Sequence, residues 1–456
     1  MNENKQTNEM ATGSIPKLFF KLAIPAVVAQ VVNLLYNIVD RIYIGHIPEI
    51  GASALTGVGL FSAILMLITA FSMLAGAGGA PLASIALGKN DKEQAEKIMT
   101  NSFLLLLVFA AILTVVFYIF APTLLTMFGA SEVTLPYAVD YARIYILGTV
   151  FVLIVTGMNP FVTTQGFANI AMLTTIIGAV INIILDPIFI FALGMGVKGA
   201  AIATVLSQAV GAIWILRFLS GNKTILKLRK ENMKLDPKIF GPTLALGISP
   251  FIMVSTESLL SISFTTSLAK YGGDIAVGAM TIITSINMLV TMPLQGFTQG
   301  GQPIRSYNYG AGNVDRVKKA FLMQFGVCVG YATLFWGLCM LMPNVFAGIF
   351  TTDATLAEYA SWAIRIYMAG IFSVGFQLSC QQSFMALGQA AISLVMAFLR
   401  KLILLIPLIF ILPNFFADKV FAVFLAEPVS DILAATITTI VFFTQFKKIM
   451  NKAKQA

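Results

Sequence analysis

Polar side chains that could bind an exchangeable cation recur at helical spacing inside a strongly apolar segment. In residues 16–45, Gln30, Asn33, Asn37 and Asp40 are spaced three, four and three residues apart. This spacing places them on one face of a helix. A polar face toward lipid would be costly, so we expect the stripe to face protein or water. A carboxylate in such a place can take up and release a proton or a small cation.

A second acid has a similar setting further along the chain. Gly178, Asn182 and Asp186 recur every four residues, again on one helical face. Both acids lie near the outer ends of their segments, and a hydroxyl lies two turns into the following one. Four oxygen-bearing side chains, Asp40, Asn182, Asp186 and Thr204, can therefore lie at similar depth in the membrane. A structural alternative remains for each acid: Asp40 beside Arg41 as an interfacial pair, and Asp186 before Pro187 as a helix-end residue.

The elements that position these residues are membrane-spanning helices. The chain has 456 residues, of which 58% are hydrophobic and only 11% are charged, with a mean hydropathy of +0.88. These values predict an all-α polytopic membrane protein, because a helix needs ~20 apolar residues to cross the hydrocarbon. Breaks at turn residues and charges predict twelve transmembrane helices: 16–45, 51–87, 98–121, 136–158, 161–191, 197–219, 239–270, 275–309, 318–343, 357–385, 388–412 and 419–446.

An internal duplication divides these helices into two six-helix lobes. The segment "ARIYILG" (142–148) matches "IRIYMAG" (364–370), and "GGAPLASIALGKND" (78–91) matches "GGQPIRSYNYGAGN" (300–313), both at an offset of 222 residues. Six helices per copy give both copies the same orientation, so a pseudo-two-fold axis along the membrane normal relates them. We expect an N-terminal lobe (1–219), a basic cytoplasmic linker (220–238) and a C-terminal lobe (239–456).

The distribution of basic residues predicts the orientation. Seven of the 29 Lys and Arg lie in 217–238 alone, and few lie in the loops that would face outside. Because cytoplasmic loops are enriched in Lys and Arg, both termini are expected in the cytoplasm, with the chain in the cell membrane. The net charge of +9 follows this topology and indicates no nucleic-acid partner.

The composition argues against an enzyme and against a bound cofactor. Three cysteines and one histidine form no metal-ligand cluster, and no phosphate-binding glycine loop occurs. No catalytic residues and no metal site are predicted. The remaining partners are the lipid bilayer and small molecules, and the protein is expected to be a monomer.

The acids are not shared between the two lobes. By the duplication, Asp40 corresponds to Thr265 and Glu257 to Val32. Glu257 has no basic residue within two turns of its own helix, so we expect it to be unpaired, either as a core acid or as a ligand for a cationic substrate. Four further charges at similar depth predict an ion-pair cluster or, alternatively, a second-lobe relay: Arg400, Lys401, Glu427 and Asp431.

Several of these stretches resemble one transporter family. "LLYNIVDRIYIGHIPEIGASALTGVG", "NIILDPIFI" and the six-plus-six repeat look like the multidrug and toxic-compound extrusion (MATE) family, in its MepA-type branch. The resemblance implies an antiporter that exports amphipathic organic cations (dyes, quaternary ammonium compounds, antibiotics) in exchange for H⁺ or Na⁺. It also implies that the four first-lobe residues named above form the coupling site. Members of the NorM type carry a further acid in helix 10, whereas this chain has Arg365 and Gln377 there.

The substrate cavity is expected between the lobes and should be soft and apolar, because Met adapts to varied shapes and aromatic faces attract cations. The residues we predict to bind substrate combine polarity or a thioether with a position inside the membrane: Asn33, Tyr36, Asn37, Met158, Glu257, Met292, Gln295, Gln299 and Gln377. Two alternatives stay open, a flippase for lipid-linked precursors and another two-lobe secondary transporter. A flippase would need a strongly cationic cavity, and a major-facilitator transporter would need a different signature in the loop "LGKNDKEQAEK".

Overall fold

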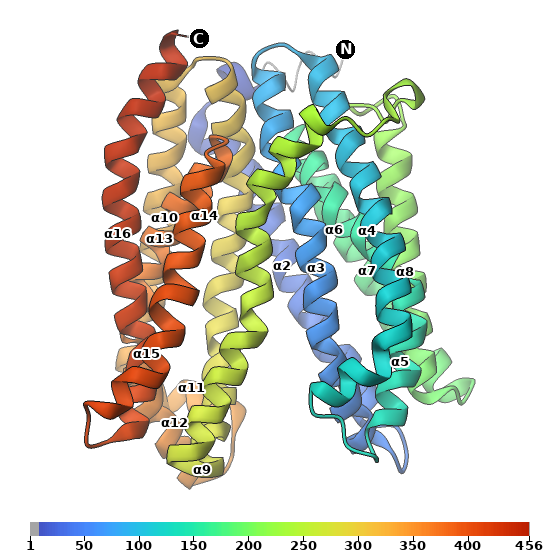
Figure 1. Cartoon of the computed structure of the whole chain (residues 1–456), viewed down its shortest axis with the longest axis vertical. Helices are drawn as coiled ribbons and strands as arrows, with labels where there is room; N and C mark the ends of the chain where they lie inside the picture. The colour runs from blue at the N-terminus through green and yellow to red at the C-terminus, as the bar shows by residue number, and fades with distance from the viewer. Residues whose placement is uncertain (1–8, 456) are drawn as a thin grey trace.

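The computed structural model describes residues 9–455, and nearly all of them are helical (Figure 1). Ten helices in this part of the chain are long and apolar enough to cross a membrane, and α5 and α6 together form an eleventh with a bend of 58°. The longest, α9, contains two helices joined at Gly273, where the backbone leaves the helical region (φ 66°, ψ −162°). The predicted number of twelve transmembrane helices is therefore confirmed.

The first lobe comprises the helices up to residue 219. Its elements are α2 (Ile15–Gly45), α3 (Gly51–Gly88), α4 (Lys92–Met127), α5 (Leu135–Leu147), α6 (Thr149–Thr164), α7 (Ala168–Pro187), the π-helix η1 (Ile188–Ala192) and α8 (Gly196–Leu219). The linker contains one 3₁₀ turn, η2 (Lys230–Asn232).

The second lobe follows from Pro237. Its elements are α9 (Pro237–Gly310), α10 (Val314–Leu341), α11 (Pro343–Phe350), α12 (Ala354–Tyr367), the 3₁₀ turn η3 (Met368–Gly370), α13 (Ile371–Ala386), α14 (Ala390–Phe398), the π-helix η4 (Leu399–Leu405), α15 (Ile406–Ile411), the 3₁₀ turn η5 (Leu412–Asn414) and α16 (Lys419–Gln455).

The predicted break between the fourth and fifth transmembrane helices is misplaced. The fourth and fifth transmembrane helices were expected to meet at Asn159–Pro160, but Pro160 lies inside α6, which continues to Thr164. The break comes at Gln165–Gly166, where Gly166 takes a positive φ of 87°. A positive φ costs glycine little, so the chain turns there. The proline is tolerated because neighbouring helices can satisfy the freed backbone carbonyl.

The helix surfaces on the outside of the bundle are apolar, as expected for a protein surrounded by lipid. Large aliphatic side chains remain more than 60% exposed on several helices, including Ile119, Ile213 and Leu334. In Figure 1 the two lobes lie close together at the end where both termini are marked and diverge toward the opposite end. We refer to these as the terminal end and the far end.

Glycines allow the two lobes to touch closely at the terminal end. A Cβ atom at Gly88 of α3 would lie 2.0 Å from the carbonyl oxygen of Tyr307 in α9, and one at Gly310 would lie 2.0 Å from that of Ile85. Gly88 and Gly310 are equivalent in the duplication, as are Ile85 and Tyr307. The same backbone contact is therefore made twice, as a two-fold axis between α3 and α9 requires.

The linker packs against the first lobe. The Gln165 side-chain oxygen accepts hydrogen bonds from the Ile225 and Leu226 amides at 2.7 and 2.8 Å. Glu96 pairs with Arg229 at 2.7 Å, and this hydrogen bond raises the pKa of Arg229 above its ordinary value. The linker is thus a fixed part of the first lobe at the terminal end.

Candidate functional site

The two first-lobe acids lie side by side inside the protein. Asp40 lies near the end of α2 and Asp186 near the end of α7, and their side chains are 8% and 0% exposed. The two carboxyl groups are close enough to interact electrostatically. One buried oxygen of each, Asp40 Oδ1 and Asp186 Oδ2, has no hydrogen-bond partner among the described residues.

The two neutral members of the predicted coupling site complete the group. The Asn182 amide donates to Asp186 Oδ1 and to Thr204 Oγ1, each at 3.2 Å. Thr204 in turn donates to the carbonyl of Ala200 at 3.0 Å. The structure thus brings together the four side chains that the sequence placed at similar depth, and it joins α2, α7 and α8. Their role in ion coupling stays a prediction.

Sequence reasoning missed two tyrosines that surround this group. Tyr141 and Tyr145 of α5 are buried and stack with their ring centroids 5.8 Å apart. Tyr36, Tyr141 and Tyr145 are all close enough to Asp40 to interact with it electrostatically. Tyr145 lies within the repeated "ARIYILG" motif and Tyr141 directly precedes it, but nothing in this pattern indicates that the two tyrosines lie near the acids.

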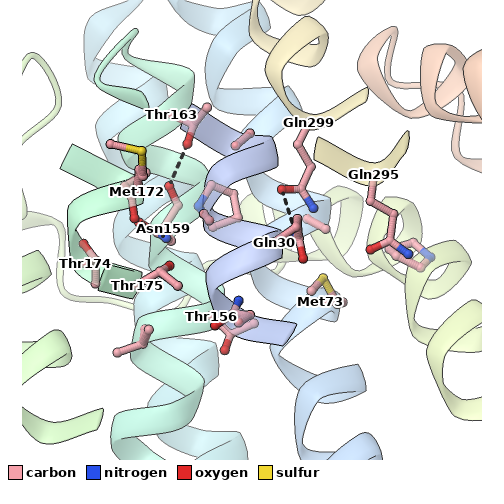
Figure 2. A pocket seen from close by; sticks show the side chains of 18 of the residues that line it. Gln30, Met73, Thr156, Asn159, Thr163, Met172, Thr174, Thr175, Gln295 and Gln299 are labelled. Carbon is pink, nitrogen blue, oxygen red and sulfur yellow. Dashed lines mark hydrogen bonds between the residues drawn. The ribbon is translucent and has the colours of Figure 1, made fainter. Parts of the chain in front are cut away.

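A cavity of about 420 Å³ lies between the lobes. Figure 2 shows its wall from close by, with Thr156, Asn159 and Thr163 of α6 on one side and Gln295 and Gln299 of α9 on the other. A hydrogen bond of 3.4 Å from Gln30 of α2 to Gln299 of α9 crosses between the lobes (Figure 2). The first-lobe wall is polar but carries no charged side chain.

Five of the nine residues predicted to bind substrate line this cavity: Asn33, Tyr36, Glu257, Gln295 and Gln299. The other four lie outside the lining. The Asn37 amide turns back to the carbonyl of Asn33 at 2.7 Å. Met158 is fully buried in the first-lobe core and Gln377 is 2% exposed inside α13. Met292 lies beside the lining on α9 and is only partly buried.

The expectation that Glu257 is unpaired is wrong. The Lys401 ammonium group donates to Glu257 Oε1 and, at 2.8 Å, to the carbonyl of Met253. The partner comes from a helix 144 residues away in sequence, which inspection of Glu257's own helix could not reveal. Both charged side chains line the cavity.

The expected ion-pair cluster forms around Arg400. Its guanidinium group lies 2.8 Å from Asp431 and 3.5 Å from Glu427, both on α16. Consecutive residues on a helical turn point in different directions, so Arg400 reaches α16 while Lys401 reaches α9. The four charges therefore form two separate sets rather than one.

Comparison with known proteins establishes the family. A family model described as MatE matches residues 25–188 and 250–411, which together make up more than half of the chain. The chain belongs to the MATE family. This MATE protein is 26% identical over 430 residues to the multidrug export protein MepA of Staphylococcus haemolyticus, a match that covers 93% of each protein. MepA of Staphylococcus aureus is 24% identical, with 92% of this chain and 93% of the relative covered.

Solved structures share the fold of this MATE protein. A crystal structure of MATE in the bent conformation superimposes with a TM-score of 0.92 at 24% identity, covering 98% of this chain and 99% of the other. An outward-facing multidrug resistance MATE family transporter superimposes with a TM-score of 0.89, covering 98% of each chain. The predicted family, its MepA-type branch and the all-α fold of twelve helices in two lobes are confirmed.

Proposed function

We propose that this protein is an efflux antiporter that exports amphipathic organic cations in exchange for a monovalent cation, H⁺ or Na⁺. One observation supports this most strongly: α2 carries both sites. Its residues Gln30, Asn33 and Tyr36 line the cavity, and Asp40 lies one turn beyond them. Tyr36 is also close enough to Asp40 and Asp186 to interact with them electrostatically. A change of charge at the acids can therefore act on the cavity wall through one helix.

Coupling in this scheme comes from differential affinity. The ion and the substrate must favour opposite states of the two lobes, or compete for shared groups. The acids are close to the cavity but do not line it, which favours the first arrangement. The curated relatives are named multidrug export proteins, and this agrees with a cavity that has many neutral polar contacts and few charges.

The flippase alternative fits the cavity less well. A carrier of lipid-linked phosphates would need an excess of cationic groups, whereas the lining contains one lysine and one glutamate, which pair with each other. We therefore retain the antiporter as the proposal.

Transport by the purified protein in lipid vesicles tests this function. Uptake of a fluorescent cation such as ethidium would be followed with a pH gradient alone, a Na⁺ gradient alone, or neither. We expect one gradient to drive accumulation, and no accumulation with either gradient would overturn the proposal. Exchange of one proton for one monocation moves no net charge and responds only to pH, at ~1.4 kcal/mol per unit. A second proton adds ~2.3 kcal/mol per 100 mV of membrane potential.

The orientation gives a further prediction. We propose that the protein lies in the cell membrane as a monomer. The basic linker supports a cytoplasmic location for both termini. A single cysteine at the exposed Lys230 should react with an impermeant maleimide only from the cytoplasmic side, and one at the exposed Glu132 only from outside. The three natural cysteines, Cys328, Cys339 and Cys380, are buried and give little background. Labelling of Lys230→Cys in intact cells would contradict this orientation.

A further inference from the structure

The charge on the cavity wall is confined to one ion pair. Among the side chains that line the cavity, only Glu257 of α9 and Lys401 of η4 are charged. Both belong to the second lobe, and the first-lobe wall facing them is neutral. Along this lining, a charged group of a substrate can therefore meet an opposite charge only at this pair.

The two members of the pair are not equally accessible. The Glu257 side chain is 52% exposed and faces the cavity, whereas the Lys401 side chain is 6% exposed. The ammonium group makes two hydrogen bonds, to Glu257 and to the carbonyl of Met253. A lysine ammonium has three protons, so one donor remains for a ligand.

No other described acid forms a salt bridge with Lys401. The neighbouring acids Glu427 and Asp431 both pair with Arg400 instead. Glu257 is thus the counter-ion of a cation that is almost completely buried. Removing one partner of a buried ion pair is costly, because it leaves an uncompensated charge.

This arrangement discriminates between ligand charges. A monovalent cation that binds Glu257 must either share it with the ammonium group or displace that group, which strips Lys401 of its counter-ion. A zwitterion avoids this cost. Its carboxylate can bind the Lys401 ammonium while its cationic group binds Glu257, so that one ion pair becomes two.

We infer that the Glu257–Lys401 pair is a subsite for zwitterionic compounds, which combine a carboxylate with an ammonium or iminium group. Lys401 is then the residue that sets the charge preference. This inference rests on the proposed function, since it assumes that the cavity binds the exported compounds. It refines the substrate class: among compounds with a cationic group, those that also carry a carboxylate bind more tightly.

The test compares two dyes that differ only in the carboxylate. Rhodamine B is a zwitterion at neutral pH, and its methyl ester is a permanent cation. Binding to the full-length protein in lipid nanodiscs would be measured by fluorescence anisotropy. We expect the natural protein to bind rhodamine B more tightly than the ester by about tenfold, and Lys401→Met to reverse this order. In that variant rhodamine B loses its partner, while the ester gains an unpaired Glu257.

Two further variants keep the result interpretable. The double variant Glu257→Gln/Lys401→Met leaves no buried charge unpaired, so it should fold and bind both dyes with similar affinity. Lys198→Met, which breaks a surface ion pair with Asp140 at 3.4 Å, should leave the preference unchanged.

Two outcomes overturn the inference: no preference in the natural protein, or equal changes for both dyes in Lys401→Met. If the ester is still exported along an ion gradient, the proposed function survives that failure. If neither dye is bound or exported, the proposed function fails with it.

Discussion

Asp40→Asn and Asp186→Asn should each reduce ion-driven efflux to the background of vesicles without protein. Each replacement removes a carboxylate from a buried pair in which one proton or small cation would be held between two acids. An asparagine can keep the hydrogen bonds of the site but cannot change its charge. Without that change, the ion gradient has no group through which to act on α2.

Substrate binding should survive in both variants, because neither acid lines the cavity. We expect the affinity for a fluorescent cation to change by less than about threefold. The melting temperature should stay equal or rise, since burying two adjacent carboxyl groups is costly. Vesicle transport, anisotropy and thermal unfolding measure the three quantities separately.

Asp140→Asn is the matched control. Asp140 lies in the same lobe, but its side chain is 46% exposed and pairs only with Lys198 at the surface. The Asp140→Asn variant should transport substrate at the rate of the natural protein. Normal ion-driven transport by Asp40→Asn or Asp186→Asn would return that acid to the structural interpretation, a helix-end residue with no part in coupling.

Gly88→Leu and Gly310→Leu should prevent the lobes from closing at the terminal end. Even a Cβ atom at either position would lie 2.0 Å from a backbone oxygen of the other lobe. Backbone atoms on a long helix cannot move aside as a flexible side chain can. Overpacking typically destabilises a structure by about 1–3 kcal/mol. A leucine side chain between two rigid helices should destabilise the closed state by an amount at or above the upper end of this range. Since 1.4 kcal/mol is a factor of about ten, the closed population should fall by about 100-fold or more.

Spin labels at the exposed Lys89 and Lys318 would measure this closure, because they lie at the terminal end of opposite lobes. The variants should show longer distances than the natural protein and little transport. Gly330→Leu is the control, because a Cβ atom there meets nothing within 4 Å. Unchanged distances in Gly88→Leu would mean that the lobes can close without this contact.

The features set by local sequence were predictable. Hydropathy places the helices, because each one must satisfy its own backbone in lipid. The duplication gives the two lobes, and spacing along single helices gave the polar faces of Asp40 and Asp186. The error at Asn159–Pro160 has a local cause as well, since an Asn-Pro pair usually marks a turn but is accommodated within a membrane helix.

The features set by tertiary packing were not predictable. Lys401 and Glu257 come from different helices, and no periodicity within either helix indicates that they meet. The same holds for Tyr141 and Tyr145, whose helix α5 packs against α8. A side chain's partner, and therefore its net charge in the site, depends on how the helices assemble.

The way the linker is fixed limits how the lobes can move. Asn101 of α4 accepts a hydrogen bond from the Asp236 amide at 2.8 Å, and α9 begins at the next residue, Pro237. In the described chain, therefore, no unconstrained residue separates the last residue held by the first lobe, Asp236, from the first helix of the second lobe. Such a short connection permits rotation but little translation. The two lobes should therefore rotate about this point rather than move apart. Inserting a few glycines between residues 236 and 237 would add the missing translational freedom without changing any side chain in either site.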